Sequence, residues 1–396
     1  MPVILQPLSE KAFRMLCCAW LAANVCTVAN DVTCAWLMTQ RTDNALLVAL
    51  VQAAAALPVL LLSLPCGALA DRLDRQTCFA ATQVWTGMVA CLLALFSVTG
   101  FLQETSLLAL TFAGGVSVAM RSPVFSALIP SVVRPDQLTS AIVLSSMSVN
   151  ISRIAGPMLA GVVLAASGPT ALFALNALAS VLALAMILGS PVSPQVPRTN
   201  SEGFASSIRV GFLYVWRSPR LRTVVAQLCF FFIQTMGLLA LLPLIARGLG
   251  GGAATFTTMM SFMGAGAVVS AFGLPWLRGR LTPANMWRYA TLILSLASTV
   301  VALTESLWVA LPAMAVAGAC WMTIGNYCNV AVQTALPEWV RARGLSIIYM
   351  ASMGGAAVGA VLWGQVASST SPGWALLGSA CVGPIVVAVV ARRQSF

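Results

Sequence analysis

Three ionisable side chains interrupt long apolar stretches of this sequence: Asp31, Arg121 and Arg153. A charge at the centre of a membrane helix costs about 2.5–3.5 kcal/mol on insertion scales, so each should face a cavity or a partner. Asp31 lies past the midpoint of the first apolar stretch by about 7 Å, at 1.5 Å per residue. A carboxyl group there is cheaper to bury when protonated, which favours reversible proton binding. A hydrogen-bonded helix contact, or exposure in an outer vestibule, is the alternative.

The two arginines allow different roles. Arg153 lies near the middle of its stretch, and Asn150 precedes it by three residues and shares its helical face. It serves either a substrate or coupling role or a structural role as a clamp between helices. By depth it is the nearest candidate counter-charge for Asp31. Arg121 lies just before Pro123 and is expected to face an inner vestibule.

Uncharged polar side chains also occur inside apolar stretches. They line a cavity or form hydrogen bonds between helices, and the sequence leaves both open. The cavity candidates are Asn30, Gln52, Asn150, Gln234, Asn326 and Asn329.

The elements that must position these residues are membrane-spanning helices. The 396 residues are 59% hydrophobic and 8% charged, with a mean hydropathy of +0.92, whereas soluble domains carry roughly 25% charged residues. A span needs about 20 apolar residues. The sequence predicts an all-α membrane protein with twelve transmembrane helices, at 15–38, 46–69, 78–101, 106–129, 138–164, 170–188, 223–245, 255–276, 287–303, 307–330, 344–366 and 374–391.

Basic residues predict the orientation of these spans. Of the 21 lysine and arginine residues, seventeen lie on one set of connecting segments and only Arg41 and Arg247 on the opposite set. The positive-inside rule then places both termini in the cytoplasm. The net charge of +11 is accounted for by these short loops, so we expect no nucleic-acid partner.

Two related halves are indicated. The run from Ile129 to Arg134 parallels the run from Leu336 to Arg341 at an offset of 207, and Gly67 parallels Gly273 at an offset of 206. We expect two pseudo-symmetric six-helix bundles, 1–188 and 223–396. Residues 189–222 would form a cytoplasmic linker with a short amphipathic helix.

One short motif lies between the second and third predicted spans. It runs GALADRLDR from Gly67 to Arg75, with Asp71 and Arg72 at its centre. A glycine permits close helix approach, and a carboxylate can accept charge-assisted hydrogen bonds in one conformation and lose them in another. These residues resemble the gating-loop signature of the major facilitator superfamily.

The resemblance runs through nearly the whole chain, which is similar to the enterobactin-exporter-type branch of that superfamily. The residues that carry it are Leu57-Pro58 and the segments 64–75, 150–161, 240–247, 336–349 and 362–364. It implies the major facilitator fold and alternating access. It also implies export of a small amphipathic or hydrophobic molecule, siderophore-like or drug-like, by proton antiport. Gly156, Pro157 and Gly161 resemble the Gly-Pro bend of antiporter span 5, whereas the arginine motif of antiporter span 4 is absent.

Other classes fit less well. The chain has no histidine, which removes the commonest general base and metal ligand, so we expect neither an enzyme nor a metal or other cofactor. Its single lysine lies outside any Gly-rich loop, which excludes a P-loop. An uptake carrier or a lipid or lysolipid flippase of the same fold remains the alternative, and a membrane sensor or embedded enzyme fits less well. We expect a monomer in a bacterial cytoplasmic (inner) membrane, with protons, a small-molecule substrate and lipid as its partners.

Overall fold

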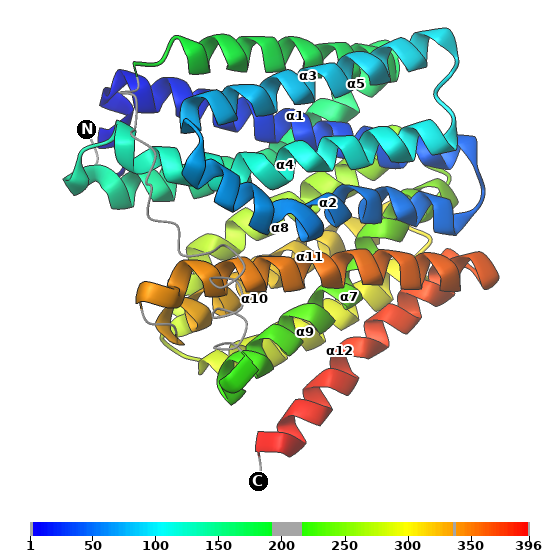
Figure 1. Cartoon of the computed structure of the whole chain (residues 1–396). Helices are drawn as coiled ribbons and strands as arrows, with labels where there is room; N and C mark the ends of the chain where they lie inside the picture. The colour runs from blue at the N-terminus through cyan, green and yellow to red at the C-terminus, as the bar shows by residue number, and fades with distance from the viewer. Residues whose placement is uncertain (1–2, 192–215, 336–337, 395–396) are drawn as a thin grey trace. The chain divides into compact units, whose positions relative to one another are not determined.

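The computed structural model describes residues 3–191, 216–335 and 338–394, and every regular element in these ranges is a helix (Figure 1). Two short 3-10 helices are η1 (Val3–Ser9) and η2 (Pro135–Gln137). The α-helices are α1 (Lys11–Arg41), α2 (Ala45–Arg72), α3 (Arg75–Thr99), α4 (Glu104–Val132), α5 (Leu138–Leu188), α7 (Pro219–Gly248), α8 (Ala253–Arg278), α9 (Pro283–Leu303), α10 (Leu307–Ala335), α11 (Glu338–Ser369) and α12 (Pro372–Gln394). The expected amphipathic helix of the linker lies mostly outside the described residues.

The longest element, α5, is two helices joined at Gly168. Its 51 residues would form a rod of about 76 Å, more than twice the thickness of a hydrocarbon core. Gly168 has φ 78° and ψ −179°, and Pro169 follows it. A residue before proline is kept out of the helical region, and only glycine adopts such a φ freely. Eleven helices of the described part are long and apolar enough to span a membrane. Dividing α5 at Gly168 gives the twelve predicted passes.

Helix ends follow ordinary capping chemistry. The Asp74 carboxylate accepts a hydrogen bond from the Thr77 backbone N–H at 2.7 Å and caps α3, which ends at Gly100 in the left-handed conformation. Thr282 caps α9 in the same way as Asp74. Because aspartate and threonine are good N-caps and glycine is a good C-terminal residue, the short connections are set locally.

The chain forms two compact units, each described here by itself. Unit 1 comprises residues 1–34 and 61–201, and unit 2 comprises residues 35–60 and 202–396. The last turns of α1 and the first half of α2 therefore belong to unit 2. The division into bundles 1–188 and 223–396 stays a prediction.

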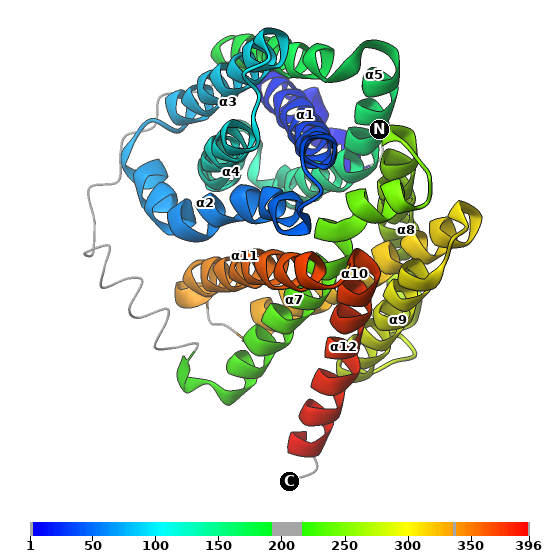
Figure 2. The same cartoon turned by 90° about the vertical axis from the view of Figure 1, so that its right-hand side faces the viewer.

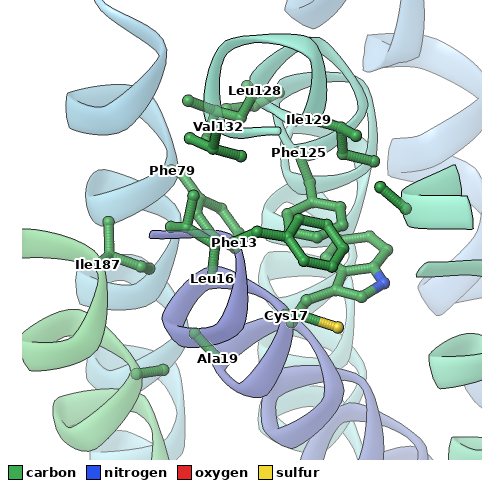
Figure 3. Packing of buried hydrophobic residues seen from close by; sticks show 14 of the residues in the cluster. Phe13, Leu16, Cys17, Ala19, Phe79, Phe125, Leu128, Ile129, Val132 and Ile187 are labelled. Carbon is green, nitrogen blue, oxygen red and sulfur yellow. The ribbon is translucent and has the colours of Figure 1, made fainter. Parts of the chain in front are cut away.

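The core of unit 1 is an aromatic and aliphatic cluster between α1, α3, α4 and α5. Figure 3 shows the rings of Phe13, Phe79 and Phe125 pointing toward one another. The Trp20 indole stacks on Phe125, with ring centroids 4.3 Å apart and planes 1° apart. Aromatic side chains bury a large apolar area each, so these rings help to hold α1 against α4.

Unit 2 is held together by close backbone packing, with α8 and α9 each alongside α10 (Figure 2). A Cβ at Gly266 on α8 would overlap the backbone of Ala315 on α10, and a Cβ at Gly318 would overlap the backbone of Met263. Small residues that let backbones approach closely are typical of helix contacts in membranes.

The outer surface of the helices is apolar. Trp308 is 83% exposed, Phe272 82% and Val98 72%. Soluble monomers rarely expose large contiguous apolar patches, so these side chains are suited to contact with lipid. The protein is a multi-pass membrane protein.

Candidate functional site

The most elaborate polar contact of unit 1 is made by Arg121 on α4. Its side chain is only 2% exposed. Both terminal nitrogens lie 3.1 Å from Thr27 Oγ1, Nη1 donates to the Ala23 carbonyl at 3.3 Å, and Nη2 donates to Asn24 Oδ1 at 3.4 Å. A buried charge needs such partners to offset its lost hydration. We expected Arg121 to face a vestibule, but it is packed against α1.

The partners on α1 share one helical face. Trp20, Asn24, Thr27 and Asp31 are spaced by four, three and four residues, which places them in a single stripe. The Arg121 guanidinium carbon lies 5.7 Å from the centre of the Trp20 ring, within the range of a cation–π interaction. This polar stripe was present in the sequence, and it is the signal that identifies α1 as the partner of Arg121.

Asp31 lies one turn beyond the contact between Arg121 and Thr27. Four residues separate Thr27 from Asp31, which is about 6 Å along the helix. Asp31 is half-buried, and it shares the face of α1 on which Arg121 is held by Thr27, one turn before Asp31. Arg153 as the counter-charge of Asp31 stays a prediction.

Arg153 and Asn150 lie on the first half of α5. Arg153 is exposed and Asn150 is half-buried. Depth along the chain made Arg153 the nearest candidate counter-charge for Asp31, and a contact between the two stays a prediction. A role for Arg153 in binding substrate stays a prediction.

Asn30 is a helix contact, and only 9% of it is exposed. The Asn176 side chain of α5 donates from Nδ2 to Asn30 Oδ1 at 3.4 Å. Asn30 Nδ2 lies 3.7 Å from Cys34 Sγ on the next turn. Of the two readings left open for Asn30, the hydrogen bond between helices is the one observed.

The Gly-Pro segment of α5 meets α1 closely. Gly156 and Pro157 are buried, and Gly161 is half-buried. A Cβ at Gly156 would lie 2.7 Å from Val28 Cβ and 3.2 Å from the Ala29 nitrogen. Pro157 stays within helical geometry, since the break in α5 is at Gly168. The glycine is therefore explained by helix approach, and a bend at Pro157 stays a prediction.

The motif that resembles the gating-loop signature begins inside a helix, because α2 continues to Arg72, and its gating role stays a prediction. The side chains of Gly67, Asp71 and Arg72 lie outside the described part. Arg75 opens α3 and donates from Nη1 to the Ala127 carbonyl of α4 at 2.9 Å. The motif is thereby joined to α4 through its last residue.

The remaining cavity candidates belong to unit 2. Gln234 is 1% exposed, and its Nε2 donates to Ser295 Oγ at 2.8 Å, joining α7 to α9. The Asn326 Oδ1 accepts a hydrogen bond from Arg278 Nη2. Gln52 is half-buried on α2. The side chain of Asn329 lies outside the described residues.

Among the residues the structure describes, no group of three or more His, Cys, Asp or Glu side chains converges to hold a metal ion. The polar groups instead form isolated contacts within a bundle of apolar, lipid-compatible helices. Ionisable side chains within membrane-spanning helices, such as Asp31 and Arg121, are typical of substrate, ion or proton pathways.

Comparison with known proteins defines the family. The model of the transmembrane secretion effector family matches residues 3–395. The chain belongs to this family of the major facilitator superfamily, and it is a transporter rather than an enzyme.

The individual relatives are only distantly similar to this chain in sequence. The enterobactin exporter EntS of Escherichia coli O1:K1 / APEC is 24% identical over 342 residues, which cover 83% of this chain and 80% of that protein. The staphyloferrin A transporter of Staphylococcus aureus (strain NCTC 8325 / PS 47) is 28% identical over 155 residues, which cover 39% of each chain.

Solved structures share the fold. A POT family transporter in complex with a thioalcohol-conjugated peptide superposes with a TM-score of 0.78 at 13% identity, covering 99% of both chains. A bacterial homologue of the human lysosomal transporter Spinster, inward-facing and occupied, gives a TM-score of 0.78 at 14% identity, covering 98% of this chain and 97% of that one. At these identities the likeness shows the twelve-helix major facilitator fold alone.

Proposed function

We propose that this transporter exports a small amphipathic or hydrophobic organic molecule, siderophore-like or drug-like, by alternating access with proton antiport. The direction is supported by the relative named as an enterobactin exporter. The protein would act as a monomer in a bacterial cytoplasmic membrane, with both termini in the cytoplasm.

The observation that carries the proposal of proton coupling is that Arg121 is held at Thr27, one turn of α1 from Asp31 and on the same helical face. An intramembrane carboxylate is cheaper to bury when protonated. A nearby guanidinium favours the ionised form. Burial and the guanidinium therefore act in opposite directions on the proton affinity of Asp31. That affinity depends, in each conformation, on the access of water to the carboxyl group and on its distance from Arg121.

Coupling then follows from linkage. If one conformation holds Asp31 closer to Arg121 or to water, that conformation binds the proton less tightly. A group whose proton affinity differs between two states shifts the equilibrium between them, and the effect is reciprocal. Proton entry from one side and release on the other would thus drive the cycle.

The test is efflux from proteoliposomes with and without an imposed pH gradient. Asp31→Asn carries no titratable group and should lose the stimulation by the gradient, while exchange without a gradient continues. Asp31→Glu should keep part of the stimulation. Asp136→Asn is a matched control, because Asp136 is an exposed carboxylate paired with Arg134 at 3.3 Å.

Full stimulation of Asp31→Asn by the gradient would show that Asp31 is structural. A wild-type protein that moves solute equally well without any gradient would identify a uniporter instead. Accumulation in the opposite direction, or movement of a labelled lipid, would identify an uptake carrier or a flippase.

A further inference from the structure

Arg41 and Arg247 occupy equivalent positions in the two halves that the sequence indicates to be related. Arg41 is the last residue of α1, and Arg247 lies in the last turn of α7. They are 206 residues apart, the same offset that relates Gly67 to Gly273. Both belong to unit 2, which includes residues 35–60.

The two arginines line one pocket. Its volume is about 500 Å³, within the range of about 300–1,000 Å³ that accommodates small-molecule ligands. The other lining residues are Trp36, Thr39, Gln40, Thr42, Asp43 and Gly251. The side chains around this space are largely polar, with two positive charges against one negative charge.

Arg247 is held in place from one side. Its Nη1 donates to the Thr39 carbonyl at 2.7 Å, and its Nη2 lies 2.7 Å from Asp43 Oδ1. The backbone contact fixes the plane of the guanidinium, which is the geometry that permits two-pronged binding of a carboxylate or phosphate. Asp43 occupies that position now, although its side chain is 88% exposed.

The positive charge of Arg41 is available to a ligand in the pocket. Its side chain is exposed, and it forms no ion pair or hydrogen bond with any residue that the structure describes. Its charge is therefore not compensated inside the pocket. Trp36 adds an apolar wall, since its indole is 6% exposed and stacks on Phe256 with centroids 6.1 Å apart.

We propose that this pocket binds the anionic group, carboxylate or phosphate, of an organic molecule between Arg41 and Arg247. Asp43 is the internal occupant that the ligand displaces. The carboxyl ends of α1 and α7 oppose an anion through their helix dipoles. That opposition is reduced on α1, because the Thr39 carbonyl already accepts a hydrogen bond from Arg247.

The same chemistry is offered by a soluble organic anion and by the phosphate of a lipid headgroup. The inference is independent of the direction of transport and of proton coupling, so a binding measurement can fail or succeed without reference to the proposed export.

The experiment measures binding to the full chain in nanodiscs of neutral phosphatidylcholine. Citrate is titrated at constant ionic strength, because screening alone weakens surface ion pairs, and binding is followed by calorimetry and by the unfolding temperature. Arg41→Gln and Arg247→Gln should each weaken citrate binding about tenfold, the loss expected for one charge-assisted hydrogen-bond pair. Asp43→Asn should strengthen it about threefold or more, since the internal competitor is removed.

A second arm uses nanodiscs containing phosphatidylglycerol and no citrate. A rise in unfolding temperature that Arg41→Gln removes would identify a lipid phosphate as the ligand. Arg134→Gln and Asp136→Asn are matched controls, because they break an exposed Arg–Asp pair outside the pocket. Neither should change citrate binding or the rise in unfolding temperature with phosphatidylglycerol.

Two results would overturn the proposal. The first is citrate and lipid responses that are the same in wild type, Arg41→Gln and Arg134→Gln. The second is weaker citrate binding by Asp43→Asn, which would mean that Asp43 supports the pocket rather than competing for it. Arg41→Gln keeps the experiment interpretable if Arg247→Gln does not fold, because the Arg41 side chain makes no hydrogen bond or ion pair with any residue that the structure describes.

Discussion

The guanidinium of Arg121 on α4 lies 5.7 Å from the centre of the Trp20 ring on α1. The indole is in turn stacked on Phe125, one turn further along α4. The arginine is therefore enclosed between an aromatic face and the hydroxyl of Thr27. Its charge is held at a fixed place one turn of α1 from Asp31.

Arg121→Lys should retain the positive charge and lose the fork that serves Thr27 and Asn24 together. Lysine is a point charge on a flexible stem and does not replace a stacked, multidentate arginine. We expect a loss of about 1–3 kcal/mol in stability from the unpaired buried groups. Thermal unfolding of the purified protein measures this, and proteoliposome efflux measures the accompanying fall in gradient-driven transport.

Arg134→Lys is the control for this substitution, because Arg134 forms an exposed ion pair of a kind that contributes little to stability. An unfolding temperature of Arg121→Lys equal to that of wild type would contradict the clamp described for Arg121.

Gly156→Ala should destabilise the contact between α1 and α5. The new Cβ would meet Val28 Cβ at 2.7 Å, so the helices must separate, at a cost of about 1–3 kcal/mol. Gly114→Ala is a matched control, because Gly114 lies inside α4 with nothing within 4 Å of a Cβ. Alanine is the better helix former by up to about 1 kcal/mol, so Gly114→Ala should be neutral or stabilising. Unfolding temperatures that fall equally in both variants would exclude the steric reason.

Asp71→Asn should slow transport with little loss of folded protein, since its carboxylate belongs to the gating motif at the end of α2. The expected cause is a changed population of the two access states. Asp74→Asn, three residues on, should transport normally because asparagine replaces aspartate well as the cap of α3. Transport rates of the two variants in proteoliposomes decide the matter, and wild-type turnover in Asp71→Asn would rule out a latch at this position.

A reporter fused after Phe396 should be active only if it is one that works in the cytoplasm. The reason is the concentration of seventeen basic residues on one set of connections against two on the other, under the positive-inside rule. A fluorescent protein and an alkaline phosphatase fused at the same residue give opposite signals. Phosphatase activity would reverse the orientation.

The spans could be predicted from the sequence because hydrophobic length alone identifies a membrane helix. The break between the fifth and sixth passes was expected between 164 and 170, and it lies at Gly168, where Pro169 sets its position. Arg153 as the counter-charge of Asp31, suggested by depth alone, stays a prediction. Depth in the membrane is one coordinate, and the side-by-side placement of α1 and α4 depends on packing that includes Trp20 and Phe125.

The single-residue connection at Gly168 has a consequence for how the protein enters the membrane. One residue cannot form a polar segment that waits in water while a second helix is synthesised, so the two passes of α5 must be inserted as a pair. Gly168 itself has open space around a Cβ but a φ of 78°. The restriction at position 168 is therefore on the backbone conformation and not on side-chain space. A residue with a Cβ there would impair formation of the helical hairpin before any contact of the finished fold is made.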